Sequence, residues 1–136
     1  MKESKLNSTV TIEIGGEERQ LKFTIGAIEE LEAYLPSRCI FDLVQKEVWS
    51  ITEIISATYC ALKVFDRKLT RPTVASWITE YTEENDIQTL RTYVFTALGL
   101  SGLITKDRSA FVNLLNILQE SKKKADEQEA EATEGK

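Results

Sequence analysis

The chain contains no histidine, only two cysteines, and fewer basic than acidic residues. Without histidine, the commonest general acid–base catalyst and the commonest metal ligand are both missing. The sequence also has no nucleophile elbow, no glycine-rich phosphate loop and no carboxylates clustered at metal-ligand spacing. We therefore expect no catalytic residues, no metal site and no cofactor, and we predict that the protein is not an enzyme.

The two cysteines, Cys39 and Cys60, each stand beside apolar residues. Two isolated thiols without a histidine do not make the usual zinc ligand set. Either the thiols are reduced and buried or they form a disulfide. We favour the reduced form, because nothing else in the sequence suggests secretion.

Long apolar runs and basic stretches are also missing. A net charge of −5 with both signs interspersed favours solubility and argues against nucleic-acid binding, which normally needs a basic face. No apolar run approaches the roughly 20 residues that span a bilayer, and the N-terminus has no signal-peptide core. We expect a cytoplasmic protein that binds neither nucleic acid nor membrane.

What the sequence does contain is a switch of apolar periodicity between residues 9 and 35. Apolar residues alternate with polar ones from 10 to 14, and Leu21 and Phe23 resume the alternation after a Gly15-Gly16 turn. This pattern predicts a β-hairpin with one apolar face. A helix capped by Thr24 should follow and cover that face. Its apolar residues recur at helical spacing: Ile25, Ile28, Leu31 and Leu35.

Further helices are predicted by their capping and stop signals. Pro36 ends the first helix, and the later ones are expected to begin at Ser37, at the Ser50–Glu53 capping box, at Thr70, at Asn85 and near Asp107. Gly99 is the expected C-cap of the helix that begins at Asn85. The expected apolar sides include Phe41 on the second helix, and Ile51, Ile54 and Phe65 on the third; the last helix should turn Phe111, Leu114, Leu115 and Leu118 inward.

The predicted fold class is α+β, an N-terminal β-hairpin followed by a bundle of about six helices. Residues 9–120 should form one domain, with residues 1–8 a flexible N-terminus and residues 121–136 a disordered tail, because neither end carries enough apolar side chains to bury. The expected core comprises Ile12, Phe23, Ile28, Leu31, Ile55, Leu62, Trp77 and Val94.

Two segments have competing interpretations. Residues 66–81 resemble a DNA-binding helix-turn-helix with Arg67, Lys68 and Arg71 on phosphates, but the acidic second helix favours ordinary packing instead. Residues 100–106 form an apolar connector. Either its apolar residues close the end of the core, which we favour, or they are exposed and bind a partner. The residues in question are Leu100, Leu103 and Ile104.

The hairpin-to-helix junction carries a family resemblance. Thr24, Ile25, Gly26 and Ala27, with Leu31-Glu32 further along, resemble the start of the tail-assembly chaperones of tailed phages, prophages and gene transfer agents. The resemblance spans roughly residues 9–120. Later in the chain, the residues that match the family are Ala61-Leu62, Leu69-Thr70, Val74 and Trp77-Ile78. In the family, acidic residues often follow the Leu-Thr pair, and here Arg71-Pro72 replaces them.

This resemblance implies a function in the bacterial host cytoplasm. A chaperone of this family binds the tape-measure protein and tail-tube subunits during tail morphogenesis and is not retained in the virion. The resemblance also implies self-association along the tape-measure protein. The alternative is a structural head-tail connector or tail-completion protein, which would also be small, acidic and α+β.

The resemblance also draws attention to Lys122, Lys123 and Lys124. Chaperones of this family are often made in two lengths, because a fraction of ribosomes slips by one base near the end of the gene. Consecutive lysine codons are a natural place for the adenine run that such a slip requires. An ordinary solubilising lysine cluster explains the same residues, and the sequence does not distinguish the two.

Overall fold

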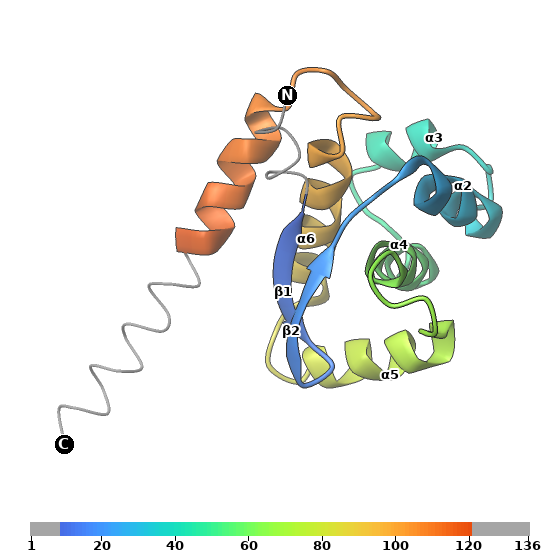
Figure 1. Ribbon diagram of the computed structural model, residues 1–136, viewed down its shortest axis with the longest axis vertical. Helices are drawn as coiled ribbons and strands as arrows, with labels where there is room; N and C mark the ends of the chain where they lie inside the picture. Colours follow the sequence, from blue (N-terminus) through green and yellow to red (C-terminus); the bar gives the residue numbers. More distant parts are fainter. Residues whose placement is uncertain (1–8, 121–136) are drawn as a thin grey trace, which may run out of the picture.

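The computed structural model describes residues 9–120, in which an antiparallel hairpin is followed by a set of helices (Figure 1). This architecture confirms the predicted α+β class. The predicted N-terminal segment 1–8, the predicted tail and Lys122, Lys123 and Lys124 lie outside the described residues. The elements are β1 (Val10–Ile14), β2 (Glu17–Leu21), α2 (Ile25–Tyr34), α3 (Ile40–Gln45), α4 (Ile51–Lys63), α5 (Arg71–Tyr81), α6 (Ile87–Leu100) and a last helix over 109–120.

The hairpin turn is a two-residue loop in which both glycines have positive φ, 66° at Gly15 and 84° at Gly16. Such a loop matches the right-handed twist of the strands and favours glycine at both positions. Trp77 of α5 packs directly on the turn, where a Cβ on Gly15 would lie 2.5 Å from the indole. The Arg19 guanidinium lies over that indole at 4.0 Å and donates from Nε to the Ile14 carbonyl at 2.9 Å. The turn is therefore tied to α5 as well as closed by its own strands.

Helix α4 is the centre of the fold. It contacts α2, α5, α6 and β2, and Figure 1 shows it nearly end-on among them. Because neighbours surround it, α4 buries residues around most of its circumference rather than along one stripe: Glu53, Ile54, Ser56, Ala57, Thr58, Tyr59, Cys60, Ala61 and Leu62. The predicted stripe was wrong at its two ends, where Ile51 is 57% and Phe65 is 54% exposed.

The hairpin and the helices share one hydrophobic core. Most of the residues expected in it are buried: Ile12, Phe23, Ile28, Leu31, Leu62 and Val94. Ile55 and Trp77 are partly buried and pack against its edge. The alternation in β1 and the helical spacing in α2 and α6 therefore identified the core correctly.

Trp49 fixes the segment between α3 and α4. It is 2% exposed, and its indole Nε1 donates to the Leu43 carbonyl at 3.1 Å. Arg91 of α6 lies over the Trp49 ring at 5.0 Å and over Phe95 at 4.7 Å, and it also donates to the Lys46 carbonyl at 3.0 Å. Burial lowers the pKa of Arg91. This stack joins the short helix α3 to α6, which are far apart in the sequence.

Helices α2 and α3 confirm some of the predicted caps and correct others. Thr24 caps α2 as predicted, because its Oγ1 accepts from the Ala27 amide at 3.1 Å. Ile25, however, is 66% exposed, so its place on the apolar stripe was wrong, and Ala27 faces the core instead. Helix α3 begins at Ile40 rather than at Ser37. Its first amide donates to the Glu32 carboxylate at 2.9 Å, a tertiary cap that the sequence pattern did not show.

Gly99 is not the C-cap that we predicted. Helix α6 continues through Leu100, Ser101 follows as its C-cap, and Gly102 provides the positive φ, 74°. Gly99 is a buried residue inside the helix. A Cβ there would lie 2.1 Å from the Phe111 ring, so the glycine allows helix 109–120 to approach α6 closely.

The predicted capping box at the start of α4 is confirmed. Ser50 Oγ accepts from the Glu53 amide at 3.1 Å, and Glu53 Oε1 accepts from the Ser50 amide at 2.7 Å. The second carboxylate oxygen accepts from Lys46 Nζ at 2.7 Å. Glu53 is 4% exposed, so this one buried carboxylate joins the start of α4 to the end of α3.

Glu53 should make the protein less stable in acid. Burial disfavours its charge, but the Lys46 ammonium and the Ser50 donors outweigh burial and hold the pKa of this carboxyl below its usual value. A lowered folded-state pKa contributes stability above the unfolded value, and that stability is lost as pH falls through the folded value. We expect the free energy of unfolding to fall more steeply from about pH 5 to about pH 3 in the native chain than in Glu53→Gln.

Urea denaturation at a series of pH values between about 5 and about 3 measures the free energy of unfolding of the native chain and of Glu53→Gln. Glutamine keeps the shape of the cap without titrating, and Glu29→Gln at an exposed carboxylate of α2 is the matched control. Parallel pH profiles for the native chain and Glu53→Gln would show that the capping carboxylate has no part in acid unfolding.

Candidate functional site

The apolar connector after α6 divides into buried and surface residues. Leu100 is fully buried as the last residue of α6, so for this residue the alternative of an exposed docking side chain was wrong. Ile104 is partly buried and packs against the core, whereas Leu103 is 39% exposed. The connector thus mainly closes the end of the core, as we favoured, and only Leu103 presents a large apolar side chain to solvent.

Helix 109–120 follows the connector and attaches to α6 by one side. Asp107 lies just before it, and its Oδ1 accepts from the Ser109 amide at 3.1 Å and from the Ser109 hydroxyl at 2.7 Å. The Phe111 ring lies 5.4 Å from the Phe95 ring and directly over Gly99. The residues of this helix that pack against the core are Phe111, Val112 and Leu115.

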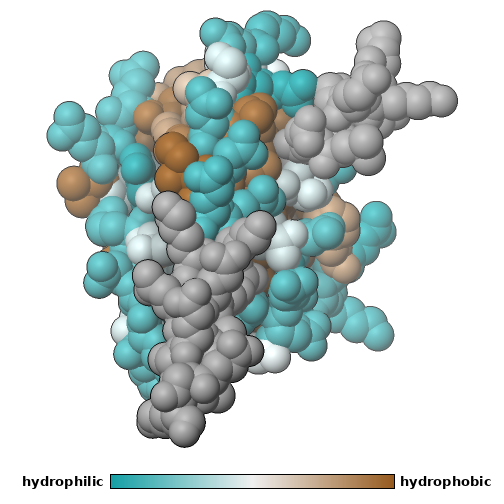
Figure 2. Space-filling view, turned by 90° about the vertical axis from the view of Figure 1, so that its left-hand side faces the viewer, coloured by the Kyte–Doolittle hydropathy of each residue, from teal (hydrophilic) through white to brown (hydrophobic). Residues whose placement is uncertain are grey.

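Three further apolar side chains of the same helix do not pack against the core. Ile117 is 57% exposed, and Leu114 and Leu118 are partly exposed. Leu114 lies three positions before Ile117 and four before Leu118, so it is next to both on the helix surface. We call them the C-terminal apolar face. Figure 2, viewed from the side on which this helix lies, shows hydrophobic side chains reaching the surface among hydrophilic ones.

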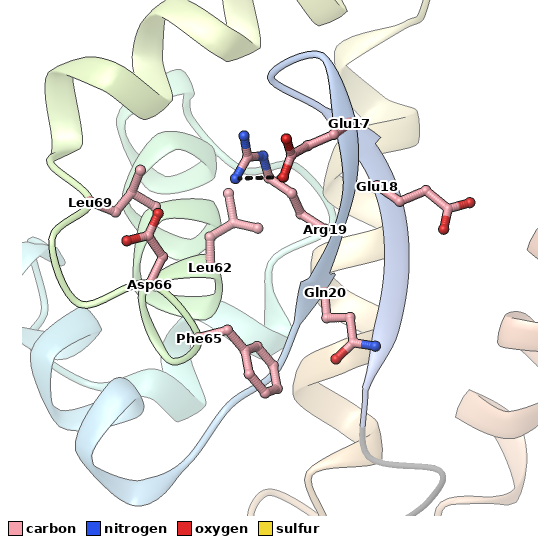
Figure 3. Close-up of a pocket in the computed structure, with 8 residues that line it drawn as sticks. All are labelled: Glu17, Glu18, Arg19, Gln20, Leu62, Phe65, Asp66 and Leu69. Carbon is pink, nitrogen blue, oxygen red and sulfur yellow. Dashed lines mark ion pairs between the residues drawn. The ribbon is translucent and has the colours of Figure 1, made fainter.

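A separate groove lies beside the hairpin (Figure 3). Its volume is about 460 Å³, and residues 17–20 of β2 form one wall. The opposite wall comes from the end of α4 and the segment before α5, through Leu62, Phe65, Asp66 and Leu69. The close-up shows Glu17 and Arg19 turned toward that opposite wall, and Glu18 and Gln20 turned away. We call this space the β2 groove. The sequence pattern gave no signal for it.

Among the described residues, no reactive group accompanies these surfaces. Burial raises the pKa of the Cys60 thiol to about 12 and, in the same way, that of Tyr81 to about 12. A thiol with such a pKa stays protonated at neutral pH and is a poor nucleophile. Cys39 and Cys60 are both free, and Cys39 is partly exposed rather than buried. Within residues 9–120 no group of His, Cys, Asp or Glu has an arrangement that would hold a metal ion.

Arg71, one of the three residues of the helix-turn-helix alternative, is occupied by internal contacts. Its Nε and Nη2 atoms both donate to Ser56 Oγ, at 3.2 and 3.1 Å, and its guanidinium lies 5.4 Å from the Tyr34 ring. Ser56 is fully buried in α4. Arg71 therefore stabilises the packing of α5 on α4.

Protein-family models, curated proteins and solved structures were all compared with the chain. None matches. Among the helices of residues 9–120, none is long and apolar enough to cross a membrane. Support for a function therefore comes from the junction at Thr24 to Ala27 and from the surfaces described above.

Proposed function

We propose that the protein is a phage tail-assembly chaperone that works in the bacterial host cytoplasm. It binds apolar, helix-forming segments of the tape-measure protein, together with tail-tube subunits, and is not retained in the virion. The C-terminal apolar face carries this proposal, because three neighbouring aliphatic side chains reach the surface there. The junction resemblance supports it, since Thr24 caps α2 and Gly26 occupies the first turn.

The size of the C-terminal apolar face suits reversible binding. Full burial of one leucine or isoleucine side chain contributes about 1.5–3 kcal/mol. Leu114 and Leu118 are already partly buried, so each adds less than that. A single contact would thus be weak, and many copies bound along one long partner would reinforce one another. Weak single contacts allow release when the tail is complete, and self-association along the partner adds avidity.

The proposal includes the absence of catalysis. A protein that covers apolar segments needs exposed aliphatic side chains rather than ionisable groups with shifted pKa values. Among the described residues, burial explains the raised pKa values of Cys60 and Tyr81. The helix cap and Lys46 explain the lowered pKa of Glu53. We therefore propose a binding protein without cofactor or metal that interacts with neither nucleic acid nor membrane.

Co-expression tests the proposal. With the chain present, we expect a larger soluble fraction of the tape-measure protein encoded by the neighbouring long reading frame. Ile117→Ser should reduce that gain, because it places a hydroxyl at the most exposed residue of the C-terminal apolar face. Ile25→Ser is the matched control, since Ile25 is similarly exposed, 66% against 57%, but lies on α2. An unchanged soluble fraction beside a well-folded chain would count against the chaperone function.

Purified particles separate the chaperone from the structural alternative. A chaperone is absent from finished virions, whereas a head-tail connector or tail-completion protein is present in fixed copy number. The two-length product stays a prediction for Lys122, Lys123 and Lys124. A slip at those codons would leave every described residue, 9–120, unchanged.

A further inference from the structure

Strand β2 is an edge strand, and its outer side lies along the β2 groove. Among the described residues it pairs only with β1, in a register that places Ile14 opposite Glu17. In a hairpin with a two-residue loop, the pair next to the loop, here Ile14 and Glu17, is hydrogen-bonded through its backbone groups. Hydrogen-bonded and non-hydrogen-bonded pairs then alternate along the two strands. Arg19 and Leu21 therefore direct their backbone groups toward β1. Gln20 directs its N–H and C=O away from β1, where another strand would find them.

The wall opposite this edge offers apolar contacts to such a strand. Phe65 is 54% exposed there, and Leu62 and Leu69 form the floor at 3% and 8% exposure. The groove closes at one end, where the Lys22 amide donates to the Ala61 carbonyl of α4 at 3.4 Å. Its volume of about 460 Å³ lies within the range of about 300–1,000 Å³ that is usual for ligand sites. A short extended segment fits this shape, with one edge on β2 and alternate side chains on Phe65.

The charge of the groove selects among such segments. Glu17 and Asp66 contribute two carboxylates on the groove side, against one guanidinium from Arg19, because the Glu18 side chain is turned away. That guanidinium lies over Trp77, donates to the Ile14 carbonyl and is 3.7 Å from Glu17. The lining is thus acidic overall, and it favours basic side chains on an incoming strand.

We propose that the β2 groove binds an extended segment of another protein as a third strand, and that this segment alternates apolar and basic side chains. Addition of a strand at an open sheet edge is a recurring mode of peptide recognition. A second copy of this chain is a poor occupant, because pairing β2 with itself brings two acidic strands together. The site is separate from the C-terminal apolar face and does not depend on the chaperone function.

A labelled octapeptide of alternating valine and lysine tests the proposal by fluorescence anisotropy, with the valine–glutamate octapeptide as the charge control. We expect the basic peptide to bind and the acidic one not to bind. Added salt should weaken the binding. In NMR spectra the Gln20 amide should shift and exchange more slowly with solvent when the basic peptide is present. Equal binding of the two peptides would overturn the proposal.

Two proline variants test the strand pairing itself. Gln20→Pro removes the outward N–H of β2 without removing a bond to β1, and edge strands tolerate such a change. It should weaken binding about tenfold, the upper effect of one lost hydrogen bond. Thr11→Pro is the matched control, because Thr11 is the partner of Gln20 in the register and lies on the strand away from the groove. Equal affinity of the two variants would overturn the pairing.

Phe65→Ala keeps the test decisive if a proline variant does not fold. Phe65 is largely exposed, so this change leaves the core intact. It should weaken binding of the basic peptide several-fold and leave the solubility gain in co-expression unchanged. Undiminished binding to Phe65→Ala would refute the groove as the site. If the native chain gives no solubility gain but binds the basic peptide, and Phe65→Ala weakens that binding, the result would count against the chaperone function alone.

Discussion

Leu31→Ala should lower the free energy of unfolding by about 2–5 kcal/mol, the range for deleting a fully buried leucine side chain. Leu31 has no solvent exposure and belongs to the single core. It lies on α2, which packs along α4, so the cavity would open beside the central helix of the fold. Urea denaturation followed by tryptophan fluorescence measures the loss.

Ile25→Ala is the matched control on the same helix. Ile25 is 66% exposed, so its truncation should change stability by no more than about 0.5 kcal/mol. The pair tests which side of α2 faces the core. Similar losses for the two variants, or a loss below about 0.5 kcal/mol for Leu31→Ala, would show that the core is misplaced.

Gly99→Ala should loosen helix 109–120 from α6. The added Cβ would lie 2.1 Å from Cδ1 of Phe111, so the ring and its helix must move. Overpacking of this kind typically destabilises by about 1–3 kcal/mol, although alanine is the better helix former. Hydrogen exchange should therefore speed up across residues 109–120 and change little in α2. Gly26→Ala is the control, because the nearest atom to its added Cβ is 3.9 Å away, and it should be stabilising by about 0.5–1 kcal/mol.

The double variant Gly99→Ala with Phe111→Ala identifies the cause. If the aromatic ring is the obstacle, removing it should be less damaging in the Gly99→Ala variant than in the native chain, with a coupling energy of about 0.5–3 kcal/mol. Additive effects, or a Gly99→Ala chain as stable as Gly26→Ala, would show that the close approach of Phe111 does not matter.

Local chemistry made most of the secondary structure predictable. The Gly15-Gly16 turn, the Thr24 cap, the stop at Pro36 and the Ser50–Glu53 capping box all work through atoms within a few residues of one another. Sequence signals that act over only a few residues can be recognised without knowledge of the tertiary structure. They were sufficient for the hairpin, for the helices and for the α+β class.

Helix faces were harder to predict because periodicity does not say how many neighbours a helix has. Helix α4 is surrounded, so it buries small and polar residues such as Ser56 and Thr58 that a hydrophobic stripe omits. Thr58 satisfies its hydroxyl within the helix by donating to the Ile54 carbonyl at 2.7 Å. At the helix ends, where no neighbour covers them, Ile25 and Ile51 are exposed although they continue the apolar pattern.

Glycine presented a similar ambiguity at Gly99. Near the end of an apolar pattern a glycine usually marks a C-cap, and that interpretation needs only local geometry. The tertiary structure uses it differently, because Phe111 of the next helix occupies the space of the missing side chain. The true chain reversal falls at Gly102, whose φ is 74°.

The sequence by itself determined the hairpin, the order of the helices and most residues of the core, since alternation, helical spacing and capping are interactions between near neighbours. Only the tertiary structure decided the surfaces. It buried Leu100, left Leu103 and Ile117 exposed, and brought residues 17–20 opposite Phe65 and Leu69. These groups meet because α4 packs against β2, and no local pattern records a contact between segments more than forty residues apart.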